Sequence, residues 1–211
     1  MAHPVNLKIV DIYHGDKVTS FTQAAQSGIV GVIHKATTGA SGKDNAYADR
    51  RQPALAAGLL WGAYHWGTNA PVAQQVDNFL KTAKPEENTL VALDYEETKG
   101  NQMTLAQARE FLTLIEQKLN RKALFYSGGL IKSQLGNKKD AFFGSHRLWL
   151  AHYNENPVVQ ASWDKFWLWQ YTDGSLGPGP RTVPGIPGNT AGELDCDSSD
   201  LSAADIKAQW A

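Results

Sequence analysis

Eight short runs of apolar, β-branched or aromatic residues recur along the chain, and each one leads into a polar residue. Runs of this length and composition are typical of β-strands that are buried on both faces. They are LKIVD, GVIHK, LLWGAYH, TLVALDYE, ALFYS, RLWLAHY, FWLWQY and ELDCD, with strand ends placed at Asp11, Lys35, His65, Asp94 to Glu96, Ser127, Tyr153, Gln170 and Asp195. The sequence therefore predicts eight strands.

Helical signals lie in the gaps between the first of these runs. Thr104 and Gln107 form a capping-box pair, and they precede the clearest apolar stripe of the chain. The stripe consists of Leu105, Ala108, Phe111, Leu112, Ile115 and Leu119. Pro71 stands where the first residue of another helix is expected. A third helix is predicted over 44–57, with a kink or a late start at Pro53.

The connections after the sixth strand lack room for a long helix. The segment 154–165 is short and contains Pro157, and ten of the nineteen residues in 174–192 are glycine or proline. The strand and helix order predicts a mixed α/β fold, a single (β/α)5β3 TIM-like barrel whose last three strands are joined by loops. We expect residues 1–211 to form one domain. An open doubly wound sheet is the alternative, but 11–16 offers only Gly15 where a phosphate-binding turn needs several glycines.

Composition and charge exclude several classes of partner and site. The 211 residues are 42% hydrophobic and 19% charged, as expected for one globular domain, and a net charge of −1 predicts no nucleic-acid partner. No apolar stretch is long enough to cross a bilayer, and 1–10 does not resemble a signal peptide, so we expect no membrane anchor. Cys196 is the single cysteine and predicts neither an internal disulfide nor a thiolate zinc site.

Asp94 and Glu96 are the strongest catalytic candidates. They lie two residues apart, so both point to the same face of the strand, with backbones about 6.6 Å apart. Two carboxylates at that spacing repel each other, which raises one pKa and leaves an acid beside an anion. This is the arrangement that glycoside hydrolysis uses. The alternative is a strand end that runs into a solvated loop.

Other polar strand ends have a functional and a structural interpretation. Lys35 is either a Schiff-base lysine or an ion-pair partner, and His65 either a site residue or a hydrogen-bonded strand-end residue. Zinc-hydrolase and serine-hydrolase motifs are absent from the sequence, and a calcium loop starting at Asp195 fails at its sixth and twelfth positions. The tryptophans Trp66, Trp149, Trp167 and Trp169 could stack on sugar rings, but alternation assigns at least half of them to the core.

Taken in order, seven segments resemble the catalytic domain of the family 25 glycoside hydrolases, lysozymes that cut peptidoglycan. They are GVIHKATTG, AAGLLWGAYHW, ALDYEE, LFYSGG, LWLAHY, WLWQYTDG and ELDCD, and the resemblance runs from about Val10 to Asp197. The first strand departs from the family pattern, because DIYHGDKV follows it where a Ser and a Trp-Gln pair are usual. Asp11 matches, but the contacts of that loop do not carry over.

The resemblance implies an N-acetylmuramidase that hydrolyses the β-1,4 bond between N-acetylmuramic acid and N-acetylglucosamine, with retention and without metal or cofactor. It implies that Glu96 is the general acid, that Asp94 acts beside it, and that Asp11 and Asp195 complete an acidic floor. It also assigns substrate or carboxylate contacts to Lys35, Tyr64, His65, Tyr126, Tyr153 and Gln170. The expected partner is the glycan strand of peptidoglycan, bound by a monomer at the bacterial cell wall.

Several alternatives stay open. The chain could be a non-catalytic peptidoglycan-binding barrel or, through Lys35, an aldolase, although the four acidic residues argue against the first and the prolines of 174–192 against the second. That segment is expected to form one wall of a glycan groove, with Arg181 either a substrate contact or a solvated side chain of a passive connector. Without a signal peptide in the sequence, the expected routes to the wall are phage lysis, a dedicated secretion system or a leader already removed.

Overall fold

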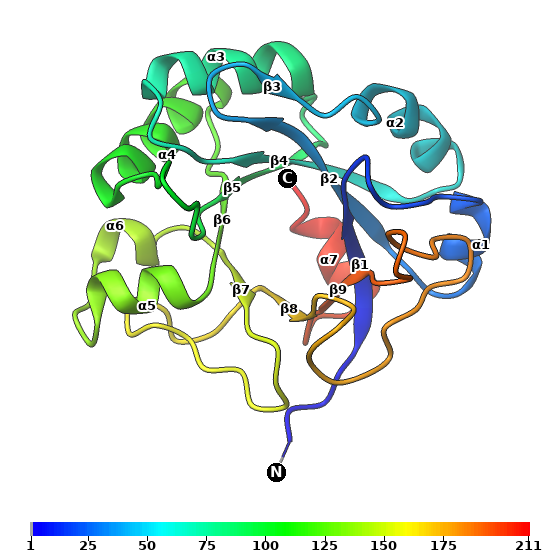
Figure 1. Ribbon diagram of the computed structural model, residues 1–211. Coiled ribbons are helices and arrows are strands. Elements are labelled where there is room, and N and C mark those ends of the chain that lie inside the picture. The colour runs from blue at the N-terminus through cyan, green and yellow to red at the C-terminus, as the bar shows by residue number, and fades with distance from the viewer. Residues whose placement is uncertain (1) are drawn as a thin grey trace.

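The computed structural model describes residues 2–211 and shows a closed eight-stranded barrel with one additional short strand (Figure 1). The strands are β1 (Leu7–Ile12), β2 (Gly31–Thr38), β3 (Gly42–Lys43), β4 (Leu60–Trp66), β5 (Leu90–Asp94), β6 (Leu124–Ser127), β7 (Leu148–Ala151), β8 (Leu168–Thr172) and β9 (Asp195–Ser198). Hydrogen bonds follow the order β1-β9-β8-β7-β6-β5-β4-β2, and pairing of β1 with β2 closes the ring. The eight predicted strands are confirmed; β3 is an antiparallel addition to the end of β2.

Strand direction differs from the expectation at one place. Apart from β3, neighbouring strands from β1 through β8 run parallel, whereas β9 is antiparallel to both β8 and β1. The chain leaves β8 at one end of the barrel, and residues 173–194 form no helix that returns it to the other end. β9 therefore enters the barrel from the end at which β8 leaves it, and Asp195 begins this strand rather than ending it.

The helices are α1 (Phe21–Gln26), α2 (Tyr47–Ala56), α3 (Val72–Ala83), α4 (Leu105–Leu119), α5 (Gly129–Leu135), α6 (Ala141–Gly144) and α7 (Ala203–Ala208). α4 begins with the predicted capping box, and α3 begins one residue after Pro71. α2 begins at Tyr47, three residues after the start of the predicted segment 44–57, and continues through Pro53, so this proline does not delay its start. None of the helices in 2–211 has the length and apolarity needed to cross a membrane.

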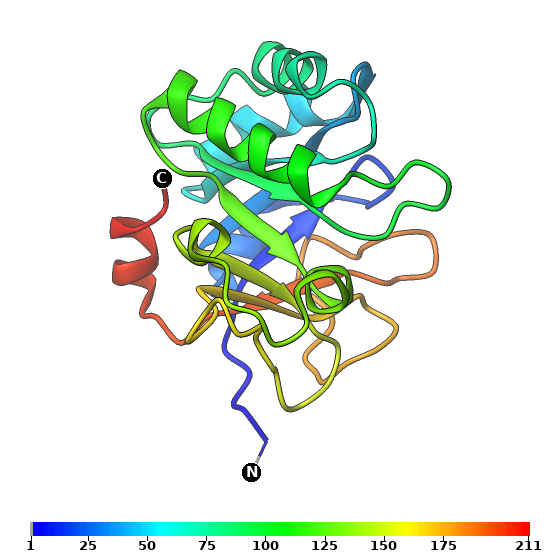
Figure 2. The same ribbon diagram turned by 90° about the vertical axis from the view of Figure 1, so that its left-hand side faces the viewer.

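Side-chain alternation divides the core into two clusters. The larger cluster lies between the barrel wall and the surrounding helices, and the smaller one fills the barrel interior. The interior cluster includes Ile9, Ile33, Leu124, Trp149 and Trp210. α7 and the last residues cover one end of the barrel, while the long loops after the strands gather at the other end (Figure 2). Side chains therefore fill the barrel interior, and the loops after the strands border its second end (Figure 2).

Candidate active site

A cavity of about 230 Å³ opens at the end of the barrel where the parallel strands finish. Its lining consists of Asp11, Tyr64, Trp66, Asp94, Glu96, Tyr126, Trp149, Tyr153, Gln170, Asp173 and Asp195. Eight of these are among the ten side chains singled out from the sequence. They come from seven strands and the segments that follow them, so barrel closure is what brings them together.

Asp94 and Glu96 are adjacent in this cavity. Asp94 is the last residue of β5 and is 4% exposed, and its carboxyl is hydrogen-bonded to that of Glu96. Burial, and then the charge of Glu96, hold the pKa of Asp94 well above its ordinary value. Burial also raises the pKa of Glu96 to about 7, opposed by the charge of Lys35. The pair therefore retains a proton near neutral pH, and desolvation contributes more to this than the repulsion expected from spacing alone.

Lys35 lies at the edge of the cavity. Its Nζ atom is 4.1 Å from the centre of the Trp66 ring and 5.9 Å from that of Tyr64, and both rings line the cavity. Burial lowers the pKa of Lys35, while the charges of Asp94 and Glu96 oppose that shift. The lysine thus supplies positive charge beside an otherwise acidic site.

Two tyrosines and a glutamine fix the position of Asp11. The hydroxyls of Tyr126 and Tyr153 each donate to Oε1 of Gln170 at 2.7 Å. The Nε2 of Gln170 in turn donates to Oδ2 of Asp11 at 2.9 Å. Because both hydroxyls occupy the carbonyl oxygen of Gln170, its amide nitrogen must face Asp11. This network holds Asp11 against the wall of the cavity.

Asp195 reaches the site from the opposite direction to the other acids. It is paired with Asp11 across the antiparallel β1 and β9 strands. Burial, followed by the charges of Asp11 and Asp16, raises the pKa of Asp195 to about 9. The floor of the cavity therefore carries a protonated carboxyl group at Asp195 near neutral pH.

His65 does not lie in the cavity, which corrects the expectation from the sequence. Its ring is fully buried outside the barrel wall, stacked on Phe111 at 4.8 Å. Its Nδ1 lies 2.7 Å from the hydroxyl of Thr37 and its Nε2 lies 3.0 Å from Oε1 of Gln75. Tyr64 precedes it and faces the interior, so alternation along β4 directs His65 outward. The hydrogen-bonded structural interpretation is the one the geometry supports.

Sequence reasoning did not single out two acidic residues near the site. Asp173 lines the cavity and follows β8 directly, so its position one residue past a strand end was the available signal. Asp197 lies in the barrel interior, two residues beyond Asp195 on the same face of β9. The Asp-x-Asp spacing of ELDCD is the available signal there, because it places both carboxyl groups on one face of the strand.

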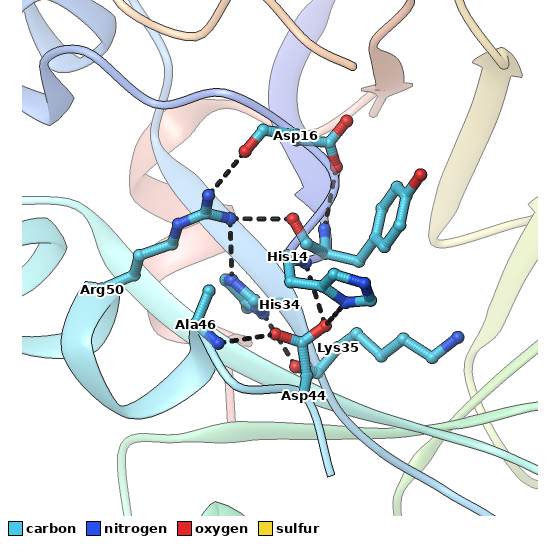
Figure 3. Close-up of polar contacts among 8 residues, drawn as sticks. His14, Asp16, His34, Lys35, Asp44, Ala46 and Arg50 are labelled. Atoms are coloured by element: carbon cyan, nitrogen blue, oxygen red, sulfur yellow. Dashed lines mark hydrogen bonds and ion pairs between the residues drawn. The ribbon is translucent and has the colours of Figure 1, made fainter. Parts of the chain in front are cut away.

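The segment after Asp11, where the sequence departs from the family pattern, is held by the polar network in Figure 3. Buried Asp44 accepts from both the backbone N–H and the Nδ1 of His14, at 2.9 and 2.8 Å. Arg50 donates to the carbonyls of Tyr13 and Asp16 and to Nε2 of His34.

The hydrogen bond between Arg50 and His34 fixes the protonation state of the histidine. Its Nε2 accepts from Arg50, so the proton of the neutral ring lies on Nδ1, which donates to the carbonyl of Lys35 at 2.8 Å. Burial lowers the pKa of His34 to about 4, consistent with a neutral ring. The segment after Asp11 is thus anchored to β2 and α2 by buried polar groups.

The glycine- and proline-rich segment 174–192 is anchored mainly by backbone contacts. The carbonyl of Gly185 accepts from the backbone N–H groups of Thr19 and Ser20, and Lys17 forms an isolated bridge with Gly188. The guanidinium of Arg181 donates to the carbonyls of Ser175 and Gly177 within its own loop. These contacts favour a structural role for Arg181.

Comparison with known proteins gives a consistent result. Residues 10–179 match the family described as Glycosyl hydrolases family 25. An autolytic lysozyme from Clostridium acetobutylicum is 28% identical over 188 residues, which cover 87% of this chain and 54% of that protein. The chain therefore spans about half the length of this curated relative.

Solved structures share the fold. A bacterial lysozyme from Streptomyces coelicolor matches with a TM-score of 0.82 and 21% identity, covering 98% of this chain and 97% of that one. A muramidase from Trichobolus zukalii matches with a TM-score of 0.78 and 23% identity, covering 96% and 98% of the two chains.

Proposed function

The chain belongs to glycosyl hydrolases family 25, and from this we propose that it is a muramidase that hydrolyses the β-1,4 bond between N-acetylmuramic acid and N-acetylglucosamine in peptidoglycan. The observation that carries the proposal is the buried pair of Asp94 and Glu96, which holds a proton near neutral pH inside a cavity at the open end of the barrel. We take the chain to act as a monomeric domain at the bacterial cell wall.

In this proposal Glu96 donates the proton of the pair to the glycosidic oxygen of the leaving group. For this step the proton of the pair sits on Glu96 and the negative charge on Asp94, which stabilises the oxocarbenium-like transition state or orients the acetamido group of the substrate for attack on the anomeric carbon. Lys35 offsets part of the negative charge at the edge of the cavity. Trp66 and Tyr64 offer aromatic surface to a sugar ring.

Digestion of purified peptidoglycan tests the bond that is cut. The products are reduced with borohydride and the reduced sugars identified, with Glu96→Gln as the inactive control. A muramidase releases fragments whose reducing end is N-acetylmuramic acid. Reducing N-acetylglucosamine ends would contradict the proposal. Retention of the protein on the wall without any soluble product would support the non-catalytic barrel instead.

A further inference from the structure

Asp197 lies in the barrel interior beneath Asp11 and is fully buried. Its Oδ1 accepts from the indole Nε1 of Trp149 at 2.6 Å. Its Oδ2 is also buried. When Asp11 is ionised, no N–H or O–H group of residues 2–211 donates to this oxygen. The group that does contact it is the carboxyl of Asp11.

A buried carboxylate oxygen without a donor is costly, and so are two touching buried carboxylates. One proton between Asp11 and Asp197 removes both costs. An O–H on Asp11 cannot donate a hydrogen bond to Gln170, because Oε1 of that residue already accepts from two tyrosine hydroxyls and its Nε2 is itself a donor. The proton of Asp11 therefore has Asp197 as its acceptor.

The neighbours of the pair favour negative charge on Asp197. The indole N–H of Trp149 can only donate, and its short contact is typical of a hydrogen bond to an ionised acceptor. Asp11, in contrast, faces the acidic cavity. Ionised Asp11 would add to the charges of the carboxyls on β5 and β9, whereas ionised Asp197 lies one layer further from the cavity.

We propose that Asp197 is a positioning residue, which accepts a hydrogen bond from a neutral Asp11 and so keeps the negative charge of this pair below the floor of the cavity. Asp11 is then a neutral acid held between Gln170 and Asp197. The charge state of Asp11 does not depend on the proposed function, but its effect on catalysis does.

The charged and titratable groups around the pair come from several elements. They are Asp195 on β9, Asp94 on β5 with Glu96 after it, Lys35 on β2, Asp16 after β1, and the phenols of Tyr64, Tyr126 and Tyr153. The charge of Asp11 raises the pKa of Asp94. A neutral Asp11 therefore makes it easier for Asp94 to become the anion that the reaction needs.

The substitution Asp197→Asn tests the charge of Asp11 directly. The amide keeps the shape of the side chain, but it donates to Asp11 where the carboxylate accepted. With aspartate labelled by ¹³C at the side-chain carboxyl, the wild type should show a neutral carboxyl at pH 6 that becomes ionised in this variant, its titration midpoint falling by about one unit or more. Asp200→Asn removes one charge at an exposed position near the same strand and should leave that signal unchanged.

Asp11→Asn provides the assignment, and it replaces the first variant should Asp197→Asn not fold. It should delete the same neutral signal, because its amide N–H takes the place of the O–H toward Asp197. Loss of a signal that is already ionised at pH 6 in the wild type would overturn the proposal. So would an unchanged spectrum of neutral carboxyls in folded Asp197→Asn.

The activity readout is separate from the titration. In Asp197→Asn the negative charge moves to Asp11, so both limbs of the kcat profile should shift to higher pH by roughly half a unit, with KM little changed. A purely structural role would lower the melting temperature without moving the limbs, and that result would overturn the proposal. If the protein hydrolyses no peptidoglycan at all, the proposed function fails while the titration result still stands.

Discussion

Glu96 gains its proposed role from burial, and the neighbouring Glu97 provides a matched control. Glu97 is exposed, whereas burial raises the pKa of Glu96 to about 7. We expect Glu96→Gln to lower peptidoglycan hydrolysis by about a hundredfold or more with an unchanged melting profile, because the amide keeps the shape and loses the donated proton. Glu97→Gln should stay near wild-type activity. Clearing of cell walls by purified Glu96→Gln at a rate close to wild type would show that another group donates the proton.

Asp94→Asn separates burial from charge as the cause of that raised pKa. Turnover should fall strongly, because the negative charge beside the reacting sugar is lost. The upper limb of the residual kcat profile should remain near pH 7, since burial and not Asp94 is the largest cause of the Glu96 shift. The measurement is kcat against pH on soluble peptidoglycan fragments. A limb that drops by more than about one unit would make the charge of Asp94 the main cause.

At this scale the sequence predicts which strand ends carry chemistry but not always which face a residue occupies. Tyr64 and His65 are adjacent on β4, so at most one of them could line the cavity. The two-residue spacing of Asp94 and Glu96 predicts that both side chains point to the same face of the strand, whichever face that is. The shared hydrogen bond of Asp11 and Asp197 depends on the pairing of two strands that are distant in sequence, which no local pattern reveals.

Among the elements, the segment 13–17 depends most on a single side chain. Asp44 accepts from two nitrogens of His14 and from the backbone N–H of Ala46. Asp44→Ala should lower the free energy of unfolding by about 2 kcal/mol, because it removes a buried acceptor of three hydrogen bonds and leaves part-buried backbone N–H groups unpaired. Asp49→Ala, at an exposed position on α2, is the control. Urea denaturation measures both, and equal stabilities would mean that water replaces Asp44 at no cost.

Local sequence signals predict most of the helices and strands, but not the direction of β9 or the presence of the very short strand β3. The capping box at Thr104 and the proline at 71 place their helices to within a residue, whereas Pro53 lies inside α2 and does not mark its start. The alternation in ELDCD reads the same in both directions, so it could not show that β9 runs antiparallel. The two residues of β3 are too short to form a pattern. α7 has a local signal in Ser202, whose side chain caps the helix by accepting from the backbone N–H of Asp205.

For the whole molecule, the buried acids and histidines set the dependence of stability on pH. Asp195 and Glu96 have folded-state pKa values of about 9 and about 7, above an unfolded value near 4, so the folded state keeps protons that the unfolded state releases. Their contribution to stability is therefore lost as the pH rises toward 9. His34 and His65, lowered to about 4, act in the opposite sense, but only below about pH 6.5.

We therefore expect the melting temperature to fall steadily from pH 6.5 to pH 9. Asp195→Asn should flatten this decline, because the amide does not titrate. Differential scanning calorimetry across the range measures both proteins. A melting temperature that holds constant or rises toward pH 9 in the wild type would contradict the raised pKa values of the buried acids.

The position of β9 between β8 and β1 also has a consequence for the order of events during synthesis. Asp11 leaves the ribosome about 180 residues ahead of its neighbours Asp195 and Asp197, and the ring of strands cannot close before they arrive. Until then the nascent chain holds Asp94 and Glu96 beside an open seam. Hydrolytic capacity should therefore appear only once translation of the domain is nearly finished, so a ribosome that stalls earlier would leave an inactive fragment.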